Sequence, residues 1–162
     1  MTSPFVAGQK LTAEDLAALI PSIATKSVDE TVNNSSAIQN DDELVLPLVA
    51  NAVYVFDLVV IYSSGTTPDI KVGFTLPTGA TTALEADFFD PSLIRNLIAQ
   101  TTVPTTGIAM GGNAATTGCR IWGTVTTGAT AGDMQTVWAQ NTANASNTIV
   151  RAGSYLLVQR VI

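Results

Sequence analysis

The chain has 162 residues, of which 12% are charged and 46% hydrophobic, with a net charge of −6 and no histidine. An average soluble domain carries about 25% charged residues. The surface of this chain must therefore be covered by uncharged polar side chains or buried against other subunits. The length predicts one domain with a short appendage. The seven basic residues are spread along the chain and predict no nucleic-acid partner.

Targeting signals and membrane spans are not expected. The longest apolar stretch, residues 53–62, is interrupted by Asp57 and is shorter than the ~20 residues of a membrane-spanning helix. Residues 1–10 lack the basic start and long apolar run of a signal peptide. Cys119 is the single cysteine, so no intrachain disulfide can form, which favours synthesis in a cytoplasm.

The first expected element is a short N-terminal helix. Thr12 can cap it, and Leu11 and Leu16 are spaced as a hydrophobic staple around that cap. Pro21 ends the apolar stripe that follows. A helix of about two turns is marginal alone in water, so it either docks on its own domain or anchors the chain in an assembly.

We therefore divide the chain into an anchor segment, residues 1–23, and a β-sandwich domain, residues 24–162. The candidate particle-anchoring residues are Phe5, Leu11, Leu16, Leu19 and Ile20.

The residue pattern of the remainder of the chain is typical of strands and turns. Strands are expected at residues 25–32, 44–49, 53–62, 70–76, 108–110, 120–127, 134–140, 146–150 and 155–162. Residues 53–62 are apolar on both faces, which predicts a central strand, and with residues 70–76 they suggest a hairpin. Pro47 should mark a strand edge or end.

Residues 83–100 are compatible with two structures. Asp90 and Pro91 could cap and start a short helix, or the segment could be a loop excursion between strands. Several short strands separated by turns predict an all-β, antiparallel β-sandwich, and among such sandwiches we favour a jelly roll.

Parts of the sequence resemble phage virion proteins. Residues 5–16, FVAGQKLTAEDL, resemble the N-terminal opening of phage minor tail and virion proteins, although Ala17 stands where that opening often has Asn. Residues 24–32 and 44–56 resemble a β-domain of tail and fibre proteins of actinobacterial phages. Further matching stretches are residues 61–63, 71–80, 137–142 and 150–156. Residues 81–118 depart from the pattern.

The resemblance implies a virion structural protein, often a homotrimeric β-sandwich, in a tail, a head fibre or a decoration protein. The implied partners are further copies of the chain and other proteins of the capsid or tail. The resemblance implies no catalytic residues and no cofactor.

The residue types leave little room for catalysis. Without histidine, Ser-His-Asp and Cys-His catalysis and histidine metal ligation are excluded. One cysteine cannot build a structural zinc site, and Cys119 is expected in the core. We therefore predict no enzyme activity, no catalytic residues, no cofactor and no metal.

The carboxylates allow alternatives. The acidic run 41–43 could bind Ca²⁺, but its spacing favours a solvated turn. Asp87 and Asp90 could act as a glycosidase pair, but helix capping by Asp90 explains it better. Asp57, in the most apolar strand, must be paired or exposed, with Arg120 or Arg151 as candidate partners within the chain or across a subunit interface.

Three functions follow from these features. The favoured one is a homo-oligomeric virion subunit. The alternative is a receptor- or glycan-binding module on the virion surface, for which Trp122 and Trp138 are the candidate ligand-facing aromatics; core packing is the competing explanation of both rings. The third is an enzyme such as a cell-wall hydrolase.

Overall fold

The computed structural model describes residues 8, 10, 12 and 20–161, and within them the chain forms strands joined by turns and loops. The strands are β1 (Ser22–Thr25), β2 (Glu30–Val32), β3 (Gln39–Leu48), β4 (Val53–Ser63), β5 (Ile70–Thr75), β6 (Thr81–Phe89), β7 (Arg95–Gln100), β8 (Ile108–Met110), β9 (Thr116–Thr126), β10 (Gly132–Gln140), β11 (Thr148–Val150) and β12 (Tyr155–Val161).

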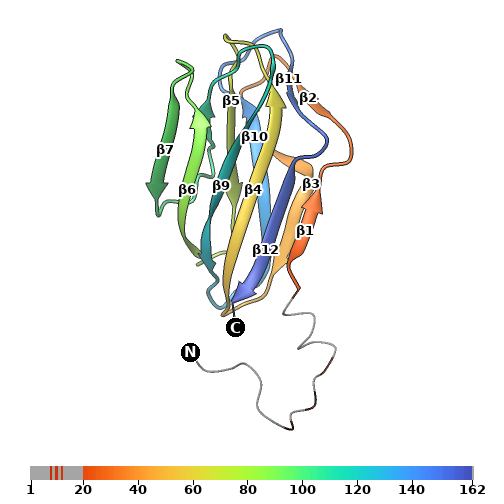
Figure 1. Ribbon diagram of the computed structural model, residues 1–162, viewed down its shortest axis with the longest axis vertical. Coiled ribbons are helices and arrows are strands. Elements are labelled where there is room, and N and C mark those ends of the chain that lie inside the picture. Colours follow the sequence, from red (N-terminus) through yellow and green to blue (C-terminus); the bar gives the residue numbers. More distant parts are fainter. Residues whose placement is uncertain (1–7, 9, 11, 13–19, 162) are drawn as a thin grey trace.

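The strands make two antiparallel sheets packed face to face (Figure 1). The large sheet has eight strands, in the order β1-β12-β4-β9-β6-β7, with β11 joining β2 to β4; the small sheet has the order β3-β10-β5-β8. The predicted all-β antiparallel sandwich is confirmed. The chain crosses between the sheets after β2, β3, β4, β5, β7, β8, β9 and β10. Greek-key sandwiches and jelly rolls both contain such crossings, so the jelly-roll assignment stays a prediction.

Alternation of apolar residues builds the core. On β4, Phe56, Leu58 and Tyr62 point inward and are buried, because successive strand side chains face opposite sides of a sheet. Phe74 on β5 meets Phe56 edge-on across the core, with ring centroids 5.3 Å apart. The two sheets therefore share one apolar interior.

Several predicted elements lie where the sequence placed them. β4 is central, between β12 and β9, and Pro47 lies on β3, an edge strand of the small sheet. The predicted strand at residues 25–32 is two short strands instead, because Lys26 leaves the ladder after Thr25 and turns inward.

Two predictions about pairing are wrong. β4 and β5 do not form a hairpin: they lie in different sheets, because residues 64–69 carry the chain across the core. Residues 83–100 form neither a helix nor a loop excursion. They form the β6–β7 hairpin, whose register pairs Phe89 with Arg95 and Leu84 with Gln100.

The proposed anchor lies almost entirely outside the described residues. This is true of the predicted N-terminal helix and of Phe5, Leu11, Leu16 and Leu19. Ile20 is described and is 67% exposed. The division into an anchor and a sandwich stays a prediction, but its boundary at residue 23 falls inside β1, whose residues pair with β12.

Candidate functional site

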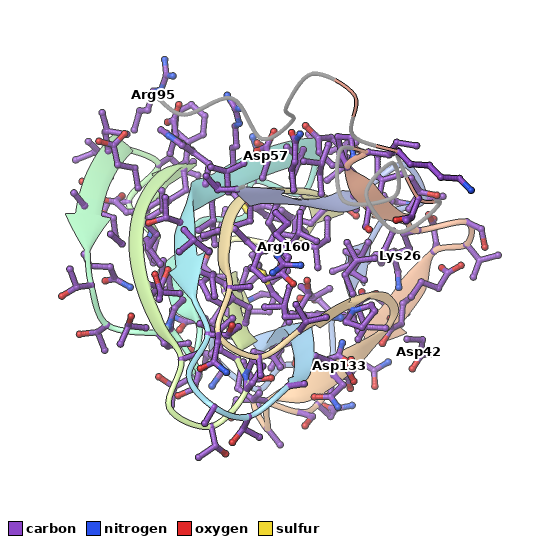
Figure 2. The ribbon with its side chains drawn as sticks, turned by 90° about the horizontal axis from the view of Figure 1, so that it is seen from below. Lys26, Asp42, Asp57, Arg95, Asp133 and Arg160 are labelled. Carbon is purple, nitrogen blue, oxygen red and sulfur yellow. The ribbon has the colours of Figure 1, made fainter. Side chains whose placement is uncertain are left out.

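The two outer faces of the sandwich differ in character. Six large hydrophobic side chains on strands of the large sheet are 40–66% exposed: Ile23, Val53, Val55, Phe89, Leu97 and Val161. Within the described chain, no exposed large hydrophobic side chain lies on a strand of the small sheet. Figure 2 shows Asp57 on the large-sheet side of the sandwich and Asp42 and Asp133 on the small-sheet side. We call the solvent side of the large sheet its outer face.

A polar cluster lies in the middle of the outer face, on β4, β9 and β12. The Arg120 guanidinium donates to both carboxylate oxygens of Asp57, at 2.7 Å (Nε–Oδ1) and 3.1 Å (Nη2–Oδ2). The Tyr155 hydroxyl donates to Asp57 Oδ2 at 3.1 Å. Arg120 also lies over the Trp122 ring, 5.1 Å from its centroid. We call Asp57, Arg120, Trp122 and Tyr155 the central cluster.

The charges of Asp57 and Arg120 compensate each other within the central cluster. The hydrogen bond and the charge of Asp57 hold the pKa of Arg120 above its ordinary value. Partial burial, with the hydrogen bond to Asp57, raises the pKa of Tyr155. The predicted partnership of Asp57 with Arg120 is thus present within one chain. Arg151, the other candidate, binds Asp29 instead, with Nη1 2.7 Å from Oδ2.

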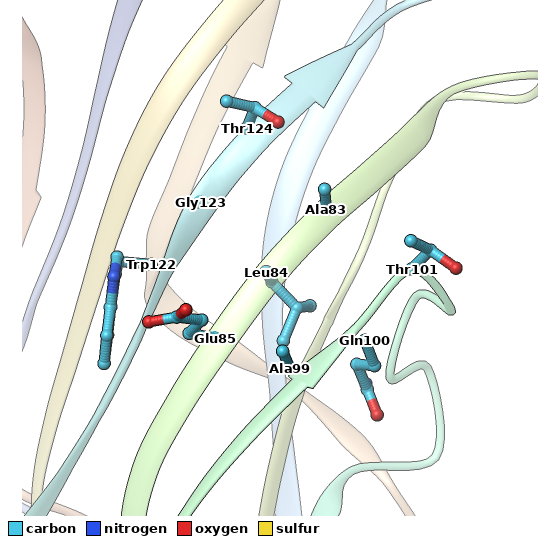
Figure 3. Close-up of a pocket in the computed structure, with 9 residues that line it drawn as sticks. All are labelled: Ala83, Leu84, Glu85, Ala99, Gln100, Thr101, Trp122, Gly123 and Thr124. Carbon is cyan, nitrogen blue, oxygen red and sulfur yellow. The ribbon is translucent and has the colours of Figure 1, made fainter.

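A shallow groove of about 680 Å³ lies beside the central cluster, over β6, β7 and β9 (Figure 3). Trp122 stands at one side, and Gln100 and Thr101 at the other. Its floor includes small side chains because Ala83 and Ala99 lie on the outer face there. The lining residues are Ala83, Leu84, Glu85, Ala99, Gln100, Thr101, Trp122, Gly123 and Thr124.

A second ion pair lies on the same face, at the hairpin. Arg95 Nε donates to Asp87 Oδ1 at 2.9 Å, and this hydrogen bond, with the charge of Arg95, lowers the pKa of Asp87. Asp90 accepts from the backbone N–H groups of Ile94 and Ser92 at 3.0 and 2.9 Å. Asp90 therefore caps a hairpin turn and not the predicted helix, and Asp87 pairs with Arg95.

The two tryptophans lie in different environments. Trp122 is half-buried on the outer face, whereas Trp138 is fully buried in the core. Trp138 is therefore wrong as a ligand-facing aromatic, because its strand β10 turns that position inward. Cys119 is buried as expected, and burial raises the pKa of its thiol to about 12.

The prediction of a solvated turn at residues 41–43 is wrong, because the run lies inside β3. Asp42 is exposed, but the side chain of Asp41 is buried and 2.9 Å from Lys26 Nζ. Glu30 approaches the same ammonium at 2.6 Å. Sequence reasoning missed this buried cluster, because only the fold brings Lys26 to β3. The described residues contain no group of His, Cys, Asp and Glu arranged to hold a metal ion.

Comparisons with known proteins identify no family. No protein-family model matches the chain, and no curated protein matches it. Among solved structures, one match is the crystal structure of the infectious bursal disease virus VP2 subviral particle, with 6% identity and a TM-score of 0.24, covering 85% of this chain. The chain spans 40% of that protein's length. Within the described residues no helix is long and apolar enough to cross a membrane.

Proposed function

We propose that this chain is a non-enzymatic structural subunit of a bacteriophage particle, made in the host cytoplasm, that works by homo-oligomeric assembly, as a homotrimer. Residues 1–23 attach it to other virion proteins. The support in the sequence is the resemblance of residues 5–16 and of the strand-forming stretches to phage virion proteins. A β-sandwich of two antiparallel sheets is compatible with that role.

The observation that carries the proposal is the contrast between the outer faces. A charge content of 12% leaves few ionic groups to hydrate a surface, and the exposed large hydrophobic side chains of the described strands all lie on the large sheet. Exposed apolar patches that exceed a few hundred Å² usually mark contact surfaces. Burial against further copies removes this patch from water.

The test is the mass of the full-length protein in solution, measured by light scattering after size-exclusion chromatography. We expect a mass near three times the 16.8 kDa of one chain, stable to dilution. A monomer at every concentration would contradict homo-oligomeric assembly. Immunogold electron microscopy of phage particles that encode the chain should label the particle, and absence of label would contradict the virion role.

A glycan-binding module is the second candidate. The observation in its favour is the half-buried ring of Trp122 at one side of a groove that has Gln100 and Thr101 at the other, since aromatic rings can stack on sugars while polar side chains bind their hydroxyl groups. Binding on a glycan array that is lost in Trp122→Ala would favour it. Turnover of peptidoglycan by the purified protein would contradict both candidates and favour an enzyme.

A further inference from the structure

We infer that the outer face of the large sheet is the surface through which copies of this chain contact one another, with the central cluster at the middle of the contact. This inference rests on the proposed homo-oligomeric function and adds which surface performs it.

The apolar surface runs across the whole sheet. The strand register places Ile23, Leu157, Asp57, Trp122, Glu85 and Ala99 in one row from β1 to β7. Val55 and Val53 continue the apolar surface along β4 on the same side, and Val161 continues it on β12. The face is therefore mixed: these apolar side chains lie beside the central cluster, Glu85 and the exposed threonines Thr81, Thr124 and Thr126.

The width of the face indicates what covers it. Six strands at about 4.8 Å spacing make a surface about 24 Å wide, whereas a helix is about 10 Å across. One segment as short as residues 1–19, as a helix or a strand, would leave most of that width in water. A second copy brings a sheet face of the same width.

The area of the face can be compared with that of known interfaces. The six strands average eight residues, or about 27 Å in length, so the face covers roughly 650 Å². A standard protein–protein interface buries about 800 Å² on each partner. Two such faces would together bury about 1,300 Å², which is at the lower end of the standard size class. Around the three-fold axis of a homotrimer, each face is shared between two neighbouring copies.

The charges on the face are arranged for burial. Asp57 is held by Arg120 and by the Tyr155 hydroxyl, and Asp87 by Arg95. Burying an ion pair is tolerable when both partners are already satisfied and costly when one is left alone. Glu85, the remaining charge on this face of β4, β6 and β9, is exposed and borders the groove.

The composition of the central cluster favours a protein over a sugar. Trp, Tyr and Arg are the residue types that dominate binding energy at protein interfaces, near the centre of the contact. One side of the Trp122 ring is already covered by the Arg120 guanidinium, which reduces the aromatic surface left for stacking on a sugar.

The first experiment compares two single substitutions that add the same charge. Val55→Lys places an ammonium on the outer face, where Val55 is 42% exposed. Val28→Lys is the matched control, because Val28 is also exposed but lies in the loop between β1 and β2. Light scattering over a dilution series should show self-association weakened more than tenfold in Val55→Lys and unchanged in Val28→Lys. Circular dichroism checks that both variants fold.

The second experiment probes the face without adding charge. Cys119 is buried and its thiol has a raised pKa, so a maleimide should label the folded wild type negligibly. Val55→Cys should then supply the only reactive thiol, and we expect slow labelling in the oligomer and fast labelling where dilution gives monomers.

The outcomes separate the inference from the proposed function. An oligomer that persists in Val55→Lys, with fast labelling of Val55→Cys, would overturn the inference and leave assembly through another surface. A wild-type monomer with fast labelling would overturn both. A monomer in which Val55→Cys is protected would overturn the inference in favour of cover by the chain's own residues.

Discussion

Lys26 is the most unusual single residue of the described chain. Its ammonium is buried between Asp41, at 2.9 Å, and Glu30, at 2.6 Å. Its backbone is held as well, since Lys26 N donates to Ser154 O and Gly153 N donates to Lys26 O. Asp41 in turn accepts from the backbone of Leu44 at 2.9 Å. The cluster therefore ties β3 to the connection between β1 and β2 and to the turn before β12.

Removing the ammonium should destabilise the fold. Lys26→Met leaves the buried carboxylate of Asp41 without its counter-charge, and breaking a buried pair in this way costs about 3–5 kcal/mol. The free energy of unfolding, measured by urea titration, should fall by about that amount. Lys71→Met is the control, because Lys71 lies half-buried on β5 outside the cluster, and we expect a change within about 0.5 kcal/mol. Equal losses in both variants would contradict a special role of Lys26.

The pH dependence gives this prediction a second readout. Burial lowers the pKa of Lys26, but the hydrogen bonds and charges of Glu30 and Asp41 outweigh it and raise the pKa above 10.5. A folded-state pKa above the unfolded value means that the stabilisation is complete below about pH 10.5 and is lost as the pH rises through the folded pKa. The stability difference between wild type and Lys26→Met should therefore shrink in alkali; a constant difference would show that packing, not charge, is responsible.

At the scale of elements, the β6–β7 hairpin contains a strained turn. Leu93 has φ +59°, in the left-handed region, which costs a side chain with a Cβ roughly 1–2 kcal/mol. Leu93 is 44% exposed and lies beside Phe89 and Gly111, so its partial apolar burial offsets only part of the strain. Its N–H donates to Asp90 O at 2.7 Å, which fixes the turn.

Leu93→Gly should therefore stabilise the protein. The strain is relieved, and the larger entropy loss of glycine on folding offsets part of the gain, so we expect up to about 1 kcal/mol. Differential scanning calorimetry should show a higher melting temperature. Ile94→Gly is the matched control: Ile94 is exposed and adjacent but has no positive φ, so only the entropy cost remains and the melting temperature should fall. A fall of the melting temperature in both variants would contradict backbone strain at Leu93.

The elements themselves were more predictable than their partners. Alternation placed strands at residues 53–62 and 70–76 because each strand buries one face within its own sequence. Pairing was not predictable, because turn residues show where the chain reverses but not whether it stays in the same sheet. Only part of the central cluster was predictable from the sequence. A carboxylate such as Asp57 in an apolar strand requires a partner, which the sequence indicates. The contact with Tyr155 was not predictable, because it depends on β12 lying next to β4 in the sheet.

At the scale of the whole molecule, the sandwich is asymmetric. The small sheet carries Lys71, Thr75 and Gln135 toward water, as antiparallel sheets with one solvated face usually do. The large sheet carries valine and isoleucine toward water on its central and edge strands. This asymmetry is invisible in the composition, since apolar residues of both faces count alike; only the strand register separates them.

The proposed contact has a defined response to salt. Each chain carries a net charge of −6, so copies repel one another at long range, while the charges within the contact face are mostly paired inside each chain. Salt screens the repulsion between chains, with a Debye length falling from about 30 Å at 0.01 M to about 3 Å at 1 M, and leaves apolar burial intact. Self-association, measured by sedimentation equilibrium, should therefore strengthen as sodium chloride increases. Weakening with salt would instead indicate ion pairs between subunits and contradict an apolar contact face. The variant Arg120→Gln should weaken association at every salt concentration, because it leaves Asp57 without its cation in the contact.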